Sequence, residues 1–181
     1  FPSRKLFIKP DRQKAIDVGM IKPTDPDPEP IIINYPKSKQ YLFKDGVAIL
    51  DIIGSNIYDR PIYFAVTCEN SKLQGINNYM SLEGLAPRIV PYKSQGVKEG
   101  GVAYSGSVNT EKIYENVMNK WKWGNFDNEE LFVDDSYSAA LMAMRSVMKR
   151  AASGLYQEGK NDQAIELSKQ YFDAFPEMNF P

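Results

Sequence analysis

The sequence predicts an α/β fold, with a mixed α+β arrangement as the alternative, in which helices flank a small central sheet and a helical hairpin follows. Short apolar runs rich in β-branched and aromatic residues, such as residues 61–67, alternate with helical periodicity in the first part of the chain. Residues 132–181 show helical spacing alone. We therefore expect an α/β domain over residues 1–131 and a hairpin over residues 132–181 packed on it.

The first elements are short. Residues 5–8 (KLFI) suit a strand, and residues 11–20 suit a short helix that closes near Gly19. Residues 22–30 (KPTDPDPEP) hold four prolines, which remove backbone donors and forbid a helix, so an extended solvent loop is expected there. Residues 31–33 begin the next strand.

A helix, a turn and a strand are expected next. From Asp45, one apolar stripe recurs at helical steps, formed by Val47, Leu50, Ile53 and Ile57. Pro61 disfavours helix at Arg60 and starts an almost continuous apolar run, so residues 61–67 are predicted to be a strand covered on both faces. The five donors of Arg60 suit the unpaired carbonyls of the ending helix, so a bracing role is favoured over chemistry.

The segment that follows is weaker in pattern. A strand is expected over residues 88–90, between prolines, and the glycine- and serine-rich residues 92–107 resemble a mobile loop. The next helix is capped by Asn109 or Thr110 and continues through apolar positions at four-residue steps to Trp121.

The C-terminal hairpin has the strongest periodicity. Its first helix starts at an acidic cap, Asp134 or Asp135, and its apolar stripe is Tyr137, Leu141, Met144, Met148, Ala151 and Leu155. The second helix carries Ala164, Leu167, Tyr171 and Ala174 and ends before Pro176. Met148, Ala151, Ala152, Leu155, Ala164 and Pro176 match tetratricopeptide-repeat spacing in part, whereas Ser168 replaces the expected aromatic residue.

Composition excludes several classes of function. The formal net charge is −1, so no basic field attracts nucleic acid, which is not expected as a partner. Histidine is absent, which removes histidine-based triads and histidine-ligated zinc, and the single Cys68 cannot form an intrachain disulfide. Phosphate-loop fingerprints and long apolar stretches are also missing, so no cofactor and no membrane span are predicted. The chain starts at Phe1 without an initiator methionine, as expected for a piece of a longer protein.

Few residues are candidates for a site, and no catalytic, cofactor-binding or metal-ligating residue is predicted. Asp25 and Asp27 form a DxD spacing, yet a proline-rich surface loop explains them better than a cation site. Trp123 and Phe126 lie among amides and lysines, which suits a sugar-binding or partner-binding surface, although packing is the alternative, as expected for Trp121 on the helix stripe. Asn56 and Arg60 complete the set of possible ligand or partner contacts.

Three segments resemble a known family. LDIIGSNIYDRPIYFA, PSRKLFIKPD and VNTEKIYENVMNKWKWG are similar, in order and spacing, to the soluble C-terminal region of bacterial multi-pass membrane proteins related to protein O-mannosyltransferases, a domain of unknown function. Asn56, Arg60 and Pro61 match the family motif. Tyr58 and Asp59 depart from it, because related sequences often carry tryptophan and a basic residue there.

This resemblance implies a setting and a role. The membrane portion of such proteins resembles lipid-linked-sugar-dependent glycosyltransferases and carries their catalytic acid, so no catalytic residue transfers to this chain. The expected function is a non-catalytic accessory domain at the periplasmic face of the inner membrane. Its expected partners are the membrane portion of the parent protein and an acceptor protein or glycan. The alternatives are a protein-interaction module formed by the hairpin, and an independent enzyme that uses Asp25, Asp27 and Arg60.

Overall fold

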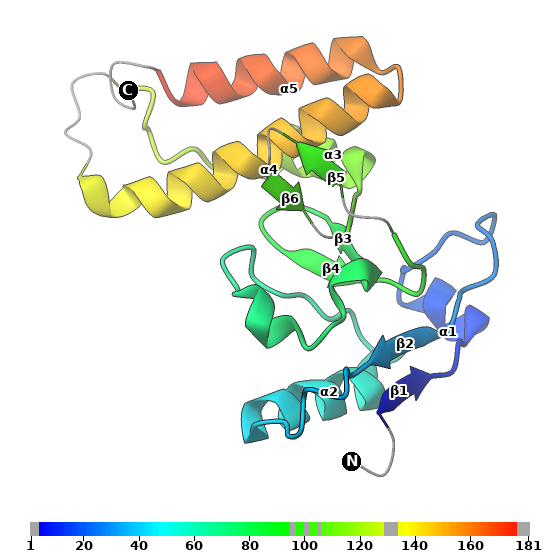
Figure 1. Cartoon of the computed structure of the whole chain (residues 1–181). Helices are drawn as coiled ribbons and strands as arrows, with labels where there is room; N and C mark the ends of the chain where they lie inside the picture. Colours follow the sequence, from blue (N-terminus) through cyan, green and yellow to red (C-terminus); the bar gives the residue numbers. More distant parts are fainter. Residues whose placement is uncertain (1–3, 95–96, 100–101, 105, 129–133, 177–181) are drawn as a thin grey trace. The chain divides into compact units, whose positions relative to one another are not determined.

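The computed structural model describes residues 4–94, 97–99, 102–104, 106–128 and 134–176. Small sheets are flanked by helices and a helical pair lies at the C-terminal end, which confirms the predicted fold class (Figure 1). The chain divides into two compact units, one of Phe1–Ser81 with Ala86–Ser107 and one of Leu82–Leu85 with Val108–Pro181. The domain boundary predicted between residues 131 and 132 stays a prediction.

The first unit begins with a strand, a helix and a strand, as predicted. β1 (Lys5–Ile8) pairs antiparallel with β2 (Ile31–Asn34), and α1 (Arg12–Asp17) lies between them in sequence. The Asp11 carboxylate accepts from the Lys14 amide, which caps α1 at its start. At its end Gly19 has a φ of +65°, a conformation that glycine adopts without a steric penalty.

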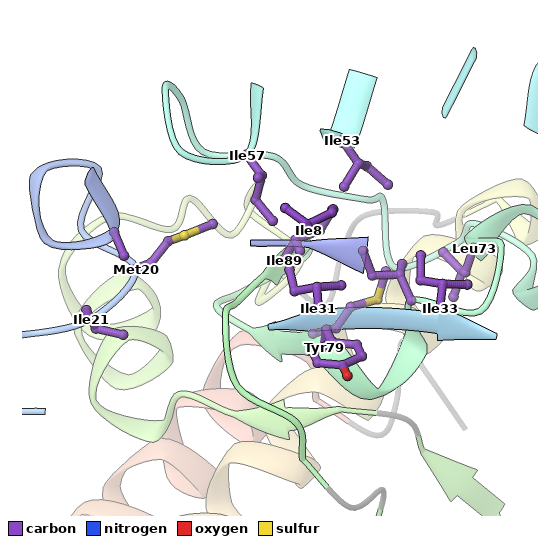
Figure 2. Close-up of a cluster of buried hydrophobic side chains, with 13 residues drawn as sticks. Ile8, Met20, Ile21, Ile31, Ile33, Ile53, Ile57, Leu73, Tyr79 and Ile89 are labelled. Atoms are coloured by element: carbon purple, nitrogen blue, oxygen red, sulfur yellow. The ribbon is translucent and has the colours of Figure 1, made fainter. Parts of the chain in front are cut away.

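The core of this unit gathers apolar side chains from distant segments. Ile8 of β1, Ile31 and Ile33 of β2, and Ile53 of α2 (Lys44–Asn56) lie together in it (Figure 2). Leu73 and Tyr79 join from two 3₁₀ helices, η1 (Asn70–Leu73) and η2 (Asn77–Tyr79). The predicted helix is thus confirmed. In its apolar stripe Ile53 and Ile57 are buried and Leu50 is half-buried, whereas Val47 remains 52% exposed.

The central strand predicted over residues 61–67 is absent. Tyr63 forms only an isolated bridge to Arg88, flanked by hydrogen bonds from the Phe64 amide to the Pro87 carbonyl and from the Ile89 amide to the Ile62 carbonyl. Pro61 offers no donor before this bridge, and a turn that the Cys68 amide closes onto the Ala65 carbonyl ends the extension after it. The segment is therefore a short ribbon with alternate residues exposed, not a strand covered on both faces.

The predicted single sheet is divided into small ones. Besides β1 and β2, β3 (Met80–Leu82) lies between β4 (Pro87–Ile89) and β7 (Ser107–Val108). β5 (Val97–Glu99) pairs antiparallel with β6 (Val102–Tyr104). The loop predicted over residues 92–107 thus holds short strands, whose three-residue length gives too little alternation to detect in the sequence.

The second unit is helical and agrees with its predicted start signals. Asn109 caps α3 (Thr110–Asn119) by accepting from the Lys112 amide, and Asp134 caps the 3₁₀ turn η3 (Asp135–Tyr137) that precedes α4 (Ser138–Gln157). α4 and α5 (Asn161–Ala174) lie side by side and form the predicted antiparallel pair (Figure 1). The buried residues of the pair include Met148, Ala151, Leu155, Ala164 and Leu167. Its resemblance to a tetratricopeptide repeat stays a prediction.

Candidate functional site

The aromatic residues that the sequence singles out form part of a packed cluster in the second unit. The Trp123 ring lies 5.7 Å from the Phe175 ring and the Phe126 ring 5.9 Å from it, measured between centroids. Phe175 is 3% exposed, and the Tyr171 ring lies 5.2 Å from it. The structure therefore brings Trp123 and Phe126 together over α5, and their half-buried rings support the alternative of packing.

Asn56 and Arg60 lie together at the C-terminal end of α2. The Asn56 side-chain amide donates to the Ile52 carbonyl over 2.9 Å, and the Asn56 carbonyl accepts from the amides of Asp59 and Arg60. The Arg60 side chain is exposed and makes no hydrogen bond or ion pair to any residue that the structure describes. The predicted bracing of the helix end by the Arg60 guanidinium is therefore wrong, since backbone amides close that turn.

A different arginine performs the capping. Arg88 of β4 is 2% exposed, and its Nη1 and Nη2 atoms donate to the Gly19 carbonyl over 2.6 Å and to the Val18 carbonyl over 2.5 Å. Its guanidinium carbon also lies 5.9 Å from the centroid of the Tyr63 ring. The carbonyls of the turn that follows α1 are thus satisfied by a residue about 70 positions away, and no sequence pattern indicates this contact.

The carboxylates of the proline-rich loop have local partners. Asp25 accepts from the Lys22 amide over 2.6 Å, and Asp27 forms an ion pair with Arg12 over 2.8 Å. Among the described residues, no group of three or more acidic or cysteine side chains is arranged to hold a metal ion. Asp25 and Asp27 therefore fix the loop to α1 and its neighbourhood rather than facing a shared site.

The two residues that depart from the family motif are both engaged. Asp59 forms an ion pair with Lys14 of α1 over 3.0 Å, and a hydrogen bond from Lys14 to Asp59 raises the pKa of that lysine. Tyr58 packs against the core of the first unit, and burial raises the pKa of its hydroxyl. Both positions thus tie the end of α2 to the rest of its unit.

A pocket of about 410 Å³ lies within the first unit, beside the start of α2. Two segments line it, one that leads into α2 and one formed by η1 and the residue after it. Its lining residues are Ser38, Lys39, Gln40, Tyr41, Leu42, Phe43, Asp45, Ser71, Lys72 and Gln74. Tyr41 and Phe43 are 66% and 70% exposed, and their rings meet edge to face with centroids 5.3 Å apart. Two large and mostly exposed aromatic side chains therefore line the pocket.

The charges around this pocket are largely paired. Lys72 Nζ lies 2.6 Å from Asp45 Oδ2, and this hydrogen bond lowers the pKa of Asp45 and raises that of Lys72. Lys39 donates to the Gln74 side-chain oxygen over 3.3 Å, and its ammonium lies 5.2 Å from the centroid of the Tyr35 ring. The pocket wall consequently combines aromatic rings, amides and hydroxyls with charges that have partners.

Gln74 at the back of the pocket has a strained backbone. Its φ is +51°, in the left-handed region that side chains other than asparagine and aspartate seldom adopt, and the residue is 9% exposed. A Cβ atom at Gly46 would lie 3.0 Å from the Gln74 amide carbon, so the glycine leaves room for this side chain. Strain of this kind persists where the surrounding structure imposes it, and it clusters at functional sites.

No pattern in the amino-acid sequence predicts this pocket. Its two lining segments are about 30 positions apart, and neither carries a motif with a recognisable ligand chemistry. The exposed aromatic pair at residues 41 and 43, just before a helix, was the available signal. In a helix-entry segment one such residue often packs back onto the helix, so the pattern alone does not predict a pocket.

Comparisons with known proteins match the first part of the chain to a protein family. Residues 1–112 match the family model described as TMEM260-associated domain 2. The chain is also 28% identical, over 128 residues, to the protein O-mannosyl-transferase tmem260 of Dictyostelium discoideum, and the match covers 69% of this chain. It covers 14% of that relative, so the chain corresponds to a small part of the longer protein. No solved structure matches the chain.

Proposed function

Because this chain belongs to the family of the TMEM260-associated domain 2, we propose that it is an accessory domain of a membrane glycosyltransferase-like protein. Its role is to hold the acceptor protein or the glycan while the membrane portion of the parent transfers the sugar. The observation that supports this is the similarity to a protein O-mannosyl-transferase along 69% of the chain.

The proposed location is the extracytoplasmic side of a membrane, which in bacteria is the periplasmic face. No helix among the described residues is long and apolar enough to cross a bilayer. Attachment to a membrane in this proposal therefore comes from the parent protein. The bacterial setting belongs to the same proposal and follows from the resemblance of the sequence segments given above.

The test compares the full-length parent protein with a form that lacks this chain. Transfer of the sugar to an acceptor protein is measured by mass spectrometry, and immunoblotting measures the level of each protein in the membrane. We expect transfer to fall sharply while the protein level stays near that of the parent. A full-length protein with Lys9→Ala is the control, because this side chain is exposed and belongs to none of the candidate contacts. Unchanged transfer in the deletion would contradict the proposal.

A second candidate function is a protein contact made by the helical pair. On α5, Ile165 and Phe172 are 55% and 57% exposed and lie seven positions apart, so they share one face of the helix. A tetratricopeptide-like pair leaves such a face for a neighbouring element. We propose the membrane portion of the parent protein as that partner.

This second candidate has its own test. The chain and the remainder of the parent are expressed as separate polypeptides, and their co-purification is quantified. Ile165→Glu with Phe172→Glu is expected to abolish co-purification, because two charges would be buried at the contact. Lys9→Ala is the control, because this side chain is exposed and does not belong to α5, and it is expected to leave co-purification unchanged. Equal recovery of the double variant and the control would exclude this face.

A further inference from the structure

From the chemistry of its walls, we infer that the pocket between residues 38–45 and 71–74 binds a neutral saccharide, whose ring stacks on Tyr41 or Phe43. This inference rests on the proposed function and names the ligand that the accessory domain would hold. A volume of about 410 Å³ falls in the ordinary range of small-molecule sites and accommodates a small glycan.

The aromatic pair supplies the first part of the argument. Tyr41 and Phe43 are mostly exposed although each could bury a large apolar area, and their edge-to-face arrangement turns their faces in different directions. The face of an aromatic ring is the negative side of its quadrupole, so it attracts the weakly positive C–H groups of a pyranose ring. Exposed rings beside a hollow are therefore suited to a ligand with C–H faces and a hydroxyl rim.

The polar groups supply the second part. Besides the aromatic residues, the lining carries carboxamides at Gln40 and Gln74 and hydroxyls at Ser38 and Ser71. Amides and hydroxyls both donate and accept, which matches the hydroxyl groups of a sugar. Gln74 is held in a strained conformation and its side-chain oxygen is fixed by Lys39, so at least one amide is positioned before a ligand arrives.

The pocket lining holds two lysines and one aspartate, and all three charges are already engaged within the protein. A phosphate at this pocket would meet the Asp45 carboxylate, which already pairs with Lys72 over 2.6 Å. The remaining cation, Lys39, is engaged with Gln74 and with the ring of Tyr35. An uncharged polyol avoids both the repulsion from Asp45 and the cost of breaking the Lys72 ion pair. A neutral saccharide is accordingly the ligand class that these residues accommodate best.

The binding test uses the ¹⁵N-labelled 181-residue chain and methyl α-mannoside as the probe. We expect saturable amide shifts confined to residues 38–45 and 71–74, with a dissociation constant in the millimolar range of about 1–10 mM. At least one of the variants Tyr41→Ala and Phe43→Ala is expected to weaken binding about tenfold. Phe7→Ala is the matched control, because Phe7 is 60% exposed in the same unit but does not line the pocket.

A second variant separates the contribution of the Gln74 side chain to sugar binding from its contribution to folding. Gln74→Gly keeps a residue that tolerates the left-handed backbone and removes the amide, so the fold is expected to persist while binding weakens. Absence of shifts at both segments would overturn the inference, and so would unchanged affinity in both the Tyr41→Ala and the Phe43→Ala variants. Stronger shifts with inorganic phosphate or with a short acceptor peptide than with the sugar would overturn the ligand class.

A final arm distinguishes this inference from the proposed function. The variants Tyr41→Ala and Phe43→Ala are placed in the full-length parent, and sugar transfer is measured. Sugar binding by the chain, with transfer unchanged even when the whole chain is deleted, supports the pocket and contradicts the accessory role. Loss of transfer on deletion, without sugar binding by the chain, contradicts the pocket and leaves the accessory role supported.

Discussion

Arg88 closes the C-terminal end of α1 by donating from Nη1 to the carbonyl oxygen of Gly19 over 2.6 Å. The guanidinium is 2% exposed, so this hydrogen bond and its companion to Val18 form in the interior of the first unit. Hydrogen bonds from a charged donor in such surroundings are stronger than neutral ones. Arg88 therefore joins β4 to α1 across the core.

The first prediction concerns this buried arginine. Arg88→Ala is expected to lower the free energy of unfolding by about 3 kcal/mol, because two carbonyls lose a charged donor and a cavity remains. Urea denaturation followed by circular dichroism measures the change. Arg60→Ala is the control and is expected to change stability by less than about 0.5 kcal/mol, since its side chain is exposed. Equal effects of the two substitutions would refute the capping role.

The second prediction compares a glycine that has no space for a side chain with one that does. At Gly106 the φ is +84° and a Cβ atom would lie 2.4 Å from the Met80 carbonyl oxygen, so Gly106→Ala is expected to destabilise by about 3 kcal/mol. At Gly54 in α2 a Cβ atom would meet nothing within 4 Å, so Gly54→Ala is expected to stabilise by about 0.5–1 kcal/mol. Chemical denaturation of both variants checks the signs, and a shared sign would contradict them.

The third prediction tests the close approach of α3 to α4. Thr110 donates to the Glu158 carboxylate over 2.9 Å, and a Cβ atom at Gly154 would lie 2.8 Å from the Thr110 methyl group. Gly154→Ala is therefore expected to destabilise the chain by about 1–2 kcal/mol. In a Thr110→Ser background, which keeps the hydroxyl and removes the methyl, the same substitution should cost less. A double-mutant cycle with no coupling would disprove this contact.

The fourth prediction concerns acid stability. The hydrogen bond from Lys72, aided by the Gly46 amide, lowers the pKa of Asp45 below its ordinary value. A lowered folded-state pKa means that the contribution to stability is complete above the ordinary value of about 3.9 and is lost as the pH falls through the folded value. Carboxyl NMR titration should show the pKa of Asp45 rising in the Lys72→Gln variant. A pKa unaffected by this substitution would show that the ion pair does not form in solution.

The fifth prediction compares a buried with an exposed phenylalanine in α5 and directly after it. Phe175 is 3% exposed and contacts the rings of Trp123 and Phe126, whereas Phe172 is 57% exposed. Phe175→Ala is expected to cost about 3–5 kcal/mol and to change tryptophan fluorescence. Phe172→Ala should cost less than about 1 kcal/mol and leave the fluorescence unchanged. Similar losses in both variants would contradict the cluster.

Much of the local structure could be predicted because its signals act within a few residues. Asp11 and Asn109 each accept a hydrogen bond from an amide three positions later, so a cap and the helix it starts are visible together in the sequence. The prolines of residues 22–30 exclude regular structure for the same local reason. The helices α2, α4 and α5 follow from apolar spacing that is repeated over several turns.

The predictions that proved wrong concern structure that depends on contacts between distant parts of the chain. Residues 61–67 have strand propensity, yet only Tyr63 pairs, because the length of a strand depends on the partner edge and on the turns around it. Arg60 follows a predicted helix, whereas Arg88 lies in a predicted strand, so local pattern favoured Arg60 as the capping residue. Only the burial of Arg88 near the end of α1 identifies it as the donor.

By itself, the sequence determined the mixed fold class, the helices with their caps and the similarity to the family of the TMEM260-associated domain 2. The tertiary structure alone decided which arginine is buried, how small the sheets are and where the pocket lies. The physical reason is the range of the interactions, since periodicity and capping act over a few residues. Lys39 and Gln74, by contrast, meet across 35 positions, through chain folding that no local pattern encodes.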